Sequence, residues 1–277
     1  MNIILFAPEE FPADAPATLA LPRADARVAH ILDVLRRKPG DTFDAGLIDG
    51  PRGKATLTAI LPAAPNAHAA HATPAALAAP NAHAARGGSL LLTFAWEKTA
   101  PPLLPPITLV IGLPRPQTAR KILNEAASLG VSEMRFIATE RGEPSYAQSA
   151  LWTSGEYRRH LVAGAAQAFC TRIPRVTFGE SLAETLGALA AAQPDAPRVA
   201  LDNYESPDSL SAHLRKLASA PAPLILAFGP ERGWSAAERD QLRAAHHAFA
   251  HLGARVLRAE TAVIAAVTLA LARMGRM

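Results

Sequence analysis

The sequence predicts an α/β protein whose C-terminal part is built on a parallel sheet and whose N-terminal part is smaller and rich in strands. From residue 107 onward, short apolar stretches alternate with longer helical patterns. Repeated strand–helix units of this kind form parallel sheets that are covered on both faces. A proline-rich stretch, residues 99–106, separates the two patterns and is typical of a stiff linker. We therefore expect a first domain over 1–98, a linker over 99–106 and a second domain over 107–277.

The first domain is expected to consist of short strands around one helix. Residues 2–6 are apolar enough for a strand, and residues 23–38 carry apolar side chains at helical spacing up to a Pro-Gly pair. Two further strands are predicted at 42–48 and 54–61, on either side of a turn rich in glycine and proline. Another strand is predicted at 89–96.

A biased segment, residues 62–88, interrupts this domain. The sequence Ala-Pro-Asn-Ala-His-Ala-Ala occurs in it twice, at 64–70 and at 79–85. Such a composition has no periodicity from which to build a packed face, so we predict a low-complexity insertion without regular structure. His68 and His71 have a spacing that metal ligands use, but in such a segment we expect no metal site.

The second domain is expected to alternate strands and helices up to the C-terminus. Strands are predicted at 107–113, 134–139, 198–201, 224–228 and 249–252, and helices at 115–129, 150–171, 181–192, 209–218, 235–247 and 261–274. Gly130 directly follows the first of these helices, where a left-handed C-cap is common. Ser235 with Glu238 three residues later predicts a capping box.

Charge and cysteine content limit the classes of function. The chain has 277 residues and a net charge of +4, with a pI near 9.6. This mild positive charge permits a polyanionic partner without requiring one. The single cysteine, Cys170, excludes an intramolecular disulfide and a cysteine-rich metal site. A lone thiol near a helix end is more often a packed small side chain than a nucleophile.

The sequence carries no sign of export or membrane insertion. Its first residues lack the basic region of a signal peptide. The longest apolar run lies within residues 262–272, which is shorter than the roughly 20 residues that a membrane helix needs. We expect a soluble, cytoplasmic protein.

Several common catalytic motifs are missing from the chain. It has no GxGxxG after a strand and no GxxxxGK[ST], HExxH or GxSxG. Their absence argues against dinucleotide-dependent oxidoreductases, P-loop NTPases, zinc metalloproteases and α/β-hydrolases.

Two short segments near the C-terminus are the most informative part of the sequence. They are Leu-Ala-Phe-Gly-Pro-Glu-Arg-Gly-Trp-Ser at 226–235 and Leu-Gly-Ala-Arg-Val-Leu-Arg-Ala-Glu-Thr-Ala at 252–262. Each runs from an apolar strand through a glycine-containing turn into a helix, and ligands of α/β proteins bind at such strand ends. In the first segment two glycines permit close backbone approach. Glu231 in this segment either accepts a hydrogen bond from a ligand or lies near a helix N-terminus, where its negative charge is favourable.

These segments resemble a pair of loops in the RsmE family of methyltransferases. Residues 226–235 are similar to the family's IGPEGG loop, and 252–262 to its LGxRVLRTETA loop, with Ala259 where the family has Thr. Residues 27–41 resemble the N-terminal signature HHLxxVLRxKPGD. Residues 125–131, 139–141 and 164–174 fall where the family has ATELGV, TERS and EAAEQSxRxxxP. The matches follow the family's order and leave out only the insertion.

The resemblance implies a fold and an activity. The first domain would be a PUA-like β-barrel that helps to hold RNA, and the second a SPOUT methyltransferase domain with a C-terminal trefoil knot. The family uses S-adenosylmethionine to methylate N3 of a uridine in 16S ribosomal RNA of the small subunit. It acts as a homodimer with each site near the subunit interface, and it implies neither a metal nor a membrane.

The resemblance also assigns candidate site residues. Those expected to bind the cofactor are Leu201, Gly229, Pro230, Glu231, Gly233, Leu252, Gly253, Leu257, Arg258, Glu260 and Thr261. Arg258 is also the candidate for stabilising negative charge on the uridine, its alternative being a partner for a phosphate or for Glu231. No residue stands out as general base. The basic residues expected to contact RNA phosphates are Arg23, Arg27, His30, Arg36, Arg37, Arg52 and Lys54.

Three departures from the family pattern keep alternatives open. Arg232 stands at one position of the usual Gly-Gly pair, so the loop backbone is expected to be less free. Residues 112–117 differ from the family's ALPKGDR-like segment, and Asp33 stands where the family often has Arg. The alternatives are an RNA-binding or ribosome-assembly module without catalysis, and a SPOUT methyltransferase that acts on another RNA position.

Overall fold

A computed structural model describes residues 2–11, 17–62, 88–217 and 223–277. The chain divides into two compact units. The first unit comprises residues 1–101 together with 169–171, and the second comprises 102–168 and 172–277. Except for its two end residues, the predicted insertion at 62–88 lies outside the described residues.

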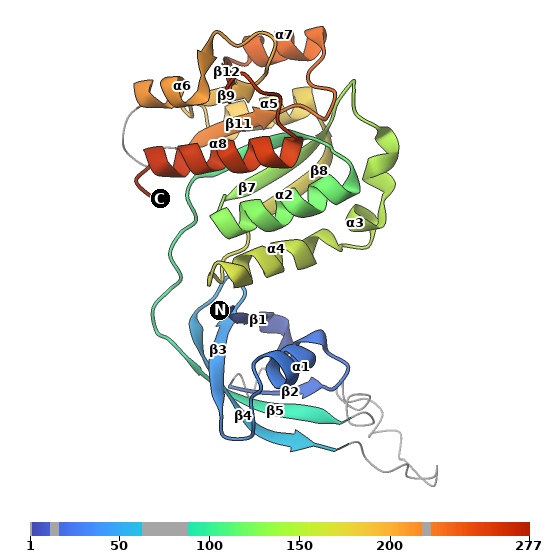
Figure 1. The fold of residues 1–277 in the computed structure, drawn as a ribbon, viewed down its shortest axis with the longest axis vertical. Coiled ribbons are helices and arrows are strands. Elements are labelled where there is room, and N and C mark those ends of the chain that lie inside the picture. Colours follow the sequence, from blue (N-terminus) through green and yellow to red (C-terminus); the bar gives the residue numbers. More distant parts are fainter. Residues whose placement is uncertain (1, 12–16, 63–87, 218–222) are drawn as a thin grey trace. The chain divides into compact units, whose positions relative to one another are not determined.

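The first unit is built on a mixed five-stranded sheet of order β1-β3-β4-β5-β2 (Figure 1). Strands β1 and β3 pair in parallel, whereas the remaining neighbours are antiparallel. The strands are β1 (Ile4–Phe6), β2 (Thr18–Pro22), β3 (Thr42–Leu47), β4 (Arg52–Leu61) and β5 (Ser89–Trp96). The sequence did not predict β2, which carries only five residues and gains its place by pairing with β5.

The helix of the first unit is shorter than the predicted 23–38. It consists of α1 (Ala26–Ala29), which continues into a π-helical turn, His30–Val34. Asp25 caps its start by accepting a hydrogen bond from the Arg27 backbone N–H at 2.8 Å. Shortly after its end, Arg36 adopts a left-handed conformation with φ of 52°, which a continuing helix does not permit.

The second unit contains a seven-stranded sheet in which every pairing is parallel, as predicted. Its order is β10-β12-β9-β11-β6-β7-β8. The strands are β6 (Ile107–Gly112), β7 (Glu133–Ala138), β8 (Arg175–Ser181), β9 (Arg198–Leu201), β10 (Asp208–Ser209), β11 (Leu224–Phe228) and β12 (Ala248–His251). The two edge strands, β8 and β10, were not predicted. None of their residues is buried, and they lack the apolar run that marks the inner strands.

Helices cover both faces of this sheet. Alternate residues of the inner strands face opposite ways. Leu226 belongs to the apolar cluster that includes residues of α2, α4, α6 and α8, and Ile225 belongs to the cluster that includes residues of α5 and α7. In Figure 1 the red helix α8 lies beside the green helix α2, in agreement with their contacts. The helices are α2 (Pro116–Leu129), α3 (Ala150–Thr153), α4 (Tyr157–Gln167), α5 (Leu182–Ala192), α6 (Leu210–Lys216), α7 (Ala236–Ala244) and α8 (Ala259–Arg273).

In this unit two predicted helix caps are confirmed and one predicted helix is wrong. Gly130 caps α2 in the left-handed conformation with φ of 84°. Ser235 and Glu238 form the predicted capping box of α7. The predicted helix over 150–171 is wrong, because the chain breaks between α3 and α4, where Gly155 has φ of 74°.

The order of the strands determines where a ligand site can form. Strands β12, β9, β11 and β6 are consecutive neighbours in the sheet and all run in the same direction. Their carboxyl ends therefore meet at one edge of the sheet. From β6 the chain adds β7 and β8 on one side and then crosses to build β9 on the other. Such a reversal of strand order leaves a crevice at the carboxyl ends of the strands.

Candidate active site

A pocket of about 720 Å³ lies at the carboxyl ends of these four strands. This volume is within the usual range of small-molecule sites. Its walls come from the segments that follow β6, β9, β11 and β12. The lining residues are Arg115, Gln117, Thr118, Lys121, Leu201, Asp202, Asn203, Tyr204, Phe228, Gly229, Pro230, Glu231, Arg232, Gly233, Trp234, Ala250, His251, Leu252, Val256, Leu257, Arg258, Ala259, Glu260 and Ala262.

The loop after β11 is packed so closely that glycine is required around it. A Cβ on Gly112, at the end of β6, would lie 2.6 Å from the backbone N of Pro230. A Cβ on Gly229 would lie 3.0 Å from the backbone N of Trp234. Gly233 has φ of 70°, a conformation that other residues rarely adopt. These glycines let two backbone segments meet at the floor of the pocket.

Arg232 does not strain this loop. Among the described residues other than glycine, positive φ values occur at Arg36, Asp49, Phe169 and His246, and not at Arg232. The residue that needs glycine is the next one, Gly233. An L-residue with a side chain therefore fits the conformation at position 232, and the expectation that the loop backbone is less free there than with glycine stays a prediction.

Hydrogen bonds from other segments hold the loop after β11 in place. Glu231 accepts a hydrogen bond from the backbone N–H of Arg115, at 3.0 Å. The Arg141 guanidinium donates to the backbone carbonyl of Arg232, at 3.3 Å. Glu231 thus ties the loop to the start of α2, which is a structural role beside the ligand-binding role predicted for it.

A buried carboxylate links the start of α7 to the segment after β7. Glu238, 2% exposed, accepts hydrogen bonds from the backbone N–H groups of Ser235 and Glu140, both at 2.8 Å. Trp234 is fully buried and donates from its indole N–H to the Leu201 carbonyl at 3.2 Å. The loop after β11 is thereby connected both to β7 and to β9.

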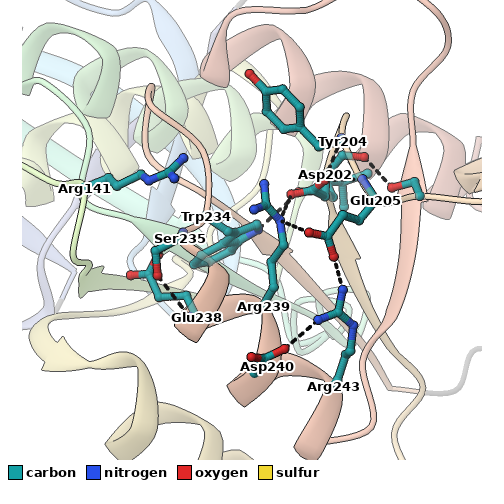
Figure 2. A network of polar contacts seen from close by, with 12 residues as sticks. Arg141, Asp202, Tyr204, Glu205, Trp234, Ser235, Glu238, Arg239, Asp240 and Arg243 are labelled. Atoms are coloured by element: carbon teal, nitrogen blue, oxygen red, sulfur yellow. Dashed lines mark hydrogen bonds and ion pairs between the residues drawn. The ribbon is translucent and has the colours of Figure 1, made fainter.

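Asp202 organises the segment after β9 (Figure 2). One of its carboxylate oxygens, Oδ1, accepts from the backbone N–H groups of Tyr204 at 2.6 Å and Glu205 at 2.8 Å. The other, Oδ2, accepts from Arg239 Nε at 2.8 Å. The side chains of Asp202 and Arg239 are only 2% and 8% exposed. This ion pair is therefore buried, and each charge depends on the other for its partner.

The segment after β12 is more open. Residues 253–256 are exposed, whereas Leu252 and Leu257 are half-buried. The backbone N–H of Gly253 donates to His251 Nδ1 at 3.0 Å. Arg258 is the N-cap residue of α8, with its side chain exposed, and its carbonyl accepts from the Ala262 N–H.

Glu260 lies in the first turn of α8 and faces Lys121 of α2. Lys121 Nζ donates to Glu260 Oε1 at 3.2 Å. Burial alone would raise the pKa of the Glu260 carboxyl, but its own backbone N–H, Lys121 and the charge of Arg258 outweigh that effect and lower its pKa. Glu260 is therefore a carboxylate at neutral pH and balances the cations of the pocket.

The structure brings together most of the residues predicted to bind a cofactor. Gly253 and Thr261 do not line the pocket, because Gly253 lies on the exposed turn after β12 and Thr261 is exposed on α8. The predicted residues that do line it are Leu201, Gly229, Pro230, Glu231, Gly233, Leu252, Leu257, Arg258 and Glu260.

Sequence reasoning missed two parts of the pocket wall. The first turns of α2 contribute Arg115 and Lys121, and the segment after β9 contributes Asp202 and Tyr204. The only indication in the sequence was that both segments directly follow predicted strands. Without the sheet order, the sequence did not indicate that these strands lie beside β11.

The basic residues predicted to contact RNA differ in solvent exposure and in whether they form ion pairs within the protein. Arg23 and Arg36 are exposed, while His30, Arg37 and Arg52 are half-buried. Lys54 pairs with Asp44 at 2.6 Å but stays 60% exposed.

Arg27 is the most constrained member of that set. Its guanidinium pairs with Glu10 at 2.5 Å and with Asp25 at 2.6 Å. Burial alone would lower the pKa of Arg27, but these two carboxylates raise it overall. The guanidinium also lies over the Phe6 ring, with 4.8 Å to the ring centre. Its contacts therefore brace the first unit, and its contact with RNA remains a prediction.

Two further observations concern the described residues as a whole. None of their helices is long and apolar enough to cross a membrane. Nor do they gather three or more His, Cys, Asp or Glu side chains in an arrangement suited to a metal ion.

Comparisons with known proteins agree with this geometry. Residues 101–271 match the family model described as an RNA methyltransferase domain. Ribosomal RNA small subunit methyltransferase E of Treponema pallidum is 33% identical over 275 residues, which are 98% of this chain and 91% of that protein.

Solved structures share the fold. Ribosomal RNA small subunit methyltransferase E from Neisseria gonorrhoeae, bound to S-adenosyl methionine, has a TM-score of 0.67 at 19% identity and covers 98% of this chain and 97% of that one. A Legionella pneumophila protein in complex with the cofactor SAM has a TM-score of 0.70 at 18% identity, with 98% of each chain covered.

Proposed function

Since the chain belongs to the ribosomal RNA small subunit methyltransferase E family, we propose that it methylates N3 of a uridine in 16S ribosomal RNA with S-adenosylmethionine as methyl donor. The observation that carries this proposal is the pocket at the carboxyl ends of β6, β9, β11 and β12. Its walls are formed by the two segments whose sequences resemble the family's loops. Their meeting at one pocket is what a shared ligand requires.

The residues of the pocket fit the chemistry of this cofactor. Apolar side chains such as Leu201 and Leu257 suit an adenine ring, and the carboxylates of Glu231 and Glu260 suit hydroxyl, ammonium and sulfonium groups. Lys121 suits a carboxylate. The absence of a Cβ at Gly229 lets the loop backbone pack closely against Gly233 and Trp234, which supports the shape of the loop that lines the pocket.

When bound, S-adenosylmethionine supplies an electrophilic methyl group. The protein's part in the reaction is mainly to position the uridine and to stabilise the negative charge that its base carries once the N3 proton has left. We assign that stabilisation to Arg258, whose guanidinium stays protonated and whose backbone is fixed as the N-cap of α8. Because N3 takes part in base pairing, the uridine must be unpaired or splayed out.

Further features of the proposal follow from the family resemblance. We infer that the first unit is a PUA-like domain that contacts RNA through Arg23, Arg36 and their basic neighbours. We also infer that the second unit is a SPOUT domain whose C-terminal segment forms a trefoil knot, and that the protein acts as a homodimer in the cytoplasm. Sedimentation of the full chain at equilibrium tests the dimer, since a monomer at micromolar concentration would contradict it.

The proposal is tested by mapping methylated nucleosides. In a strain without this gene, mass spectrometry of 16S ribosomal RNA should show the loss of one N3-methyluridine, which the intact gene restores. Titration calorimetry should show that the purified chain binds S-adenosylmethionine. Cofactor binding with loss of a different modified nucleoside would instead indicate another RNA position. Absence of both cofactor binding and any lost methylation would indicate a module without catalysis.

A further inference from the structure

One aromatic side chain of the pocket is exposed in a way that the cofactor site does not explain. Tyr204 is 80% exposed, whereas two other aromatic residues of the lining, Phe228 and Trp234, are 3% and 0% exposed. The Tyr204 ring lies beside the loop after β11, since its Cε2 would be 4.0 Å from a Cβ on Gly233. An aromatic ring is thus held at the mouth of the pocket, open to solvent.

The backbone that carries Tyr204 is held firmly. Asp202 accepts hydrogen bonds from the backbone N–H groups of Tyr204 and Glu205. The carbonyl of Asp202 accepts from the Ser206 hydroxyl, and its N–H donates to the Ala250 carbonyl at 3.1 Å. Hydrogen bonds therefore hold the turn internally, and one more connects it to β12. The exposed Tyr204 side chain is therefore carried by a backbone held in a fixed position.

A network of charges lies behind the ring (Figure 2). The Arg239 guanidinium lies over the Tyr204 ring, 5.5 Å from its centre, while its Nε pairs with Asp202. Glu205 pairs with Arg239 at 3.7 Å and also with Arg243, which in turn pairs with Asp240 at 2.7 Å. A cation near the ring supports its orientation. Each charged side chain of this network thus has at least one partner of opposite sign.

The surroundings of the exposed ring match those of an RNA base. Bases that have been splayed out of a helix stack on aromatic side chains and are held between aromatic and apolar groups. The same pocket contains a second exposed apolar side chain, Val256, which is 81% exposed on the segment after β12. Arg232, Arg258 and Arg115 add cations to the lining for the adjoining phosphates.

We propose that the Tyr204 ring is a platform on which an unpaired base of the RNA substrate stacks as it enters the pocket. This proposal rests on the proposed function, because it requires an RNA substrate with an unpaired base. Tyr204 is not among the residues predicted to bind the cofactor, and it is 80% exposed in the pocket lining, so its ring is available to a second ligand. Asp202 and Arg239 are positioning residues that act through Tyr204.

The test separates RNA binding from cofactor binding in Tyr204→Ala, Tyr204→Phe and a control, Leu103→Ala, which removes an apolar side chain 75% exposed outside the pocket. The RNA is 16S ribosomal RNA from a strain without this gene. Loss of one stacked base should weaken RNA binding and raise the KM for RNA by about tenfold in Tyr204→Ala. Tyr204→Phe, which keeps the ring, and Leu103→Ala should stay within about twofold of the unaltered protein.

Two further measurements make the outcome decisive. The slope of log affinity against log salt should be unchanged in Tyr204→Ala, because stacking releases no counterions. The Kd for S-adenosylmethionine should also be unchanged. The proposal is overturned if Tyr204→Ala binds RNA normally, if the salt slope falls by about one as for a lost phosphate contact, or if cofactor affinity is what falls. If the unaltered protein binds RNA but transfers no methyl group, the proposed function is refuted. The RNA affinity of Tyr204→Ala, compared with that of the unaltered protein, would still decide whether a base stacks on Tyr204.

Discussion

The two walls of the pocket are built in different ways. One wall, residues 202–206 and 229–234, is fixed by buried contacts, and we call it the anchored wall. These contacts are the Asp202–Arg239 ion pair and the bond from the buried Trp234 indole to Leu201, and an exposed hydrogen bond between Glu231 and Arg115 adds to them. The other wall, residues 252–258, exposes Gly253 through Val256 to solvent, and we call it the open wall.

This difference predicts how each wall responds when a ligand binds. A wall whose polar groups are already satisfied within the protein loses little conformational entropy when a ligand binds. A wall with exposed side chains gains most of its contacts from the ligand. We therefore expect the anchored wall to keep the same shape with and without cofactor, and the open wall to become ordered against the cofactor.

The largest effect should come from breaking the buried ion pair of the anchored wall. Arg239→Met leaves the Asp202 carboxylate buried without its charged partner, which costs about 3–5 kcal/mol of unfolding free energy. The matched control is Arg243→Met, whose side chain is 47% exposed and whose loss should cost less than about 1 kcal/mol. Urea denaturation at neutral pH measures both. Equal effects of the two substitutions would mean that the wall is not anchored by burial.

Acid should destabilise the protein at the amino end of β12, the strand whose carboxyl end leads into the open wall. His247 directly precedes β12, and burial, together with the charge of Arg198, lowers its pKa to about 4 from 6.5. Between these values the unfolded chain binds the proton and the folded chain does not, so stability falls as the pH falls from 6.5 to 4. The contribution of His247 to that loss is on the order of 3 kcal/mol.

The variant His247→Leu isolates this contribution. Urea denaturation at several pH values should show a shallower loss of stability below pH 6.5 than in the unaltered protein. His213, whose pKa is also lowered by burial and by Lys216, is retained in both proteins and so does not affect the difference. The same pH dependence in both proteins would refute the assignment.

Arg258 tests the chemical role of the open wall. If its guanidinium stabilises charge on the base, Arg258→Ala should lower kcat by about 100-fold, as removal of one charge-stabilising donor does in other enzymes. The KM for RNA should change little. A rise in that KM with kcat unchanged would instead assign Arg258 to a phosphate, and Arg258→Lys should then retain most of the activity because a point charge suffices there.

A smaller effect is expected where the anchored wall meets β6. In Gly112→Ala the new Cβ would lie 2.6 Å from the Pro230 backbone N, so the loop must shift at a cost of about 1–3 kcal/mol. Calorimetry should show about tenfold weaker binding of S-adenosylmethionine. Gly187→Ala in α5 is the matched control, because its Cβ meets nothing within 4 Å. Unchanged cofactor affinity in Gly112→Ala would show that this close approach does not shape the site.

The sequence predicted the parts of the pocket that carry local signals. Strand-to-helix turns with glycine indicated residues 229–233 and 252–260, and the alternation of elements indicated the parallel sheet. Tyr204 and Lys121 were missed because they follow β9 and β6, and these strands lie beside the pocket only because the sheet order places them on either side of β11. That order depends on contacts distant in sequence, and a single sequence does not display them.

The same reasoning explains errors in the secondary structure. The break between α3 and α4 occurs at Gly155, and an isolated glycine within a helical pattern does not by itself end a helix. The strand β8 lies at an edge with mostly half-buried or exposed residues, so its pattern lacked the apolar run of the inner strands.

The account as a whole is tested most directly by hydrogen exchange of the backbone amides with and without S-adenosylmethionine. Amides of the anchored wall, such as those of Tyr204 and Glu205, should exchange slowly in both states. Amides of residues 253–257 should exchange rapidly in the free protein and become protected when the cofactor is added. Protection that is unchanged in both walls, or that appears only outside residues 202–206, 229–234 and 252–260, would contradict the assignment of this pocket to the methyl donor.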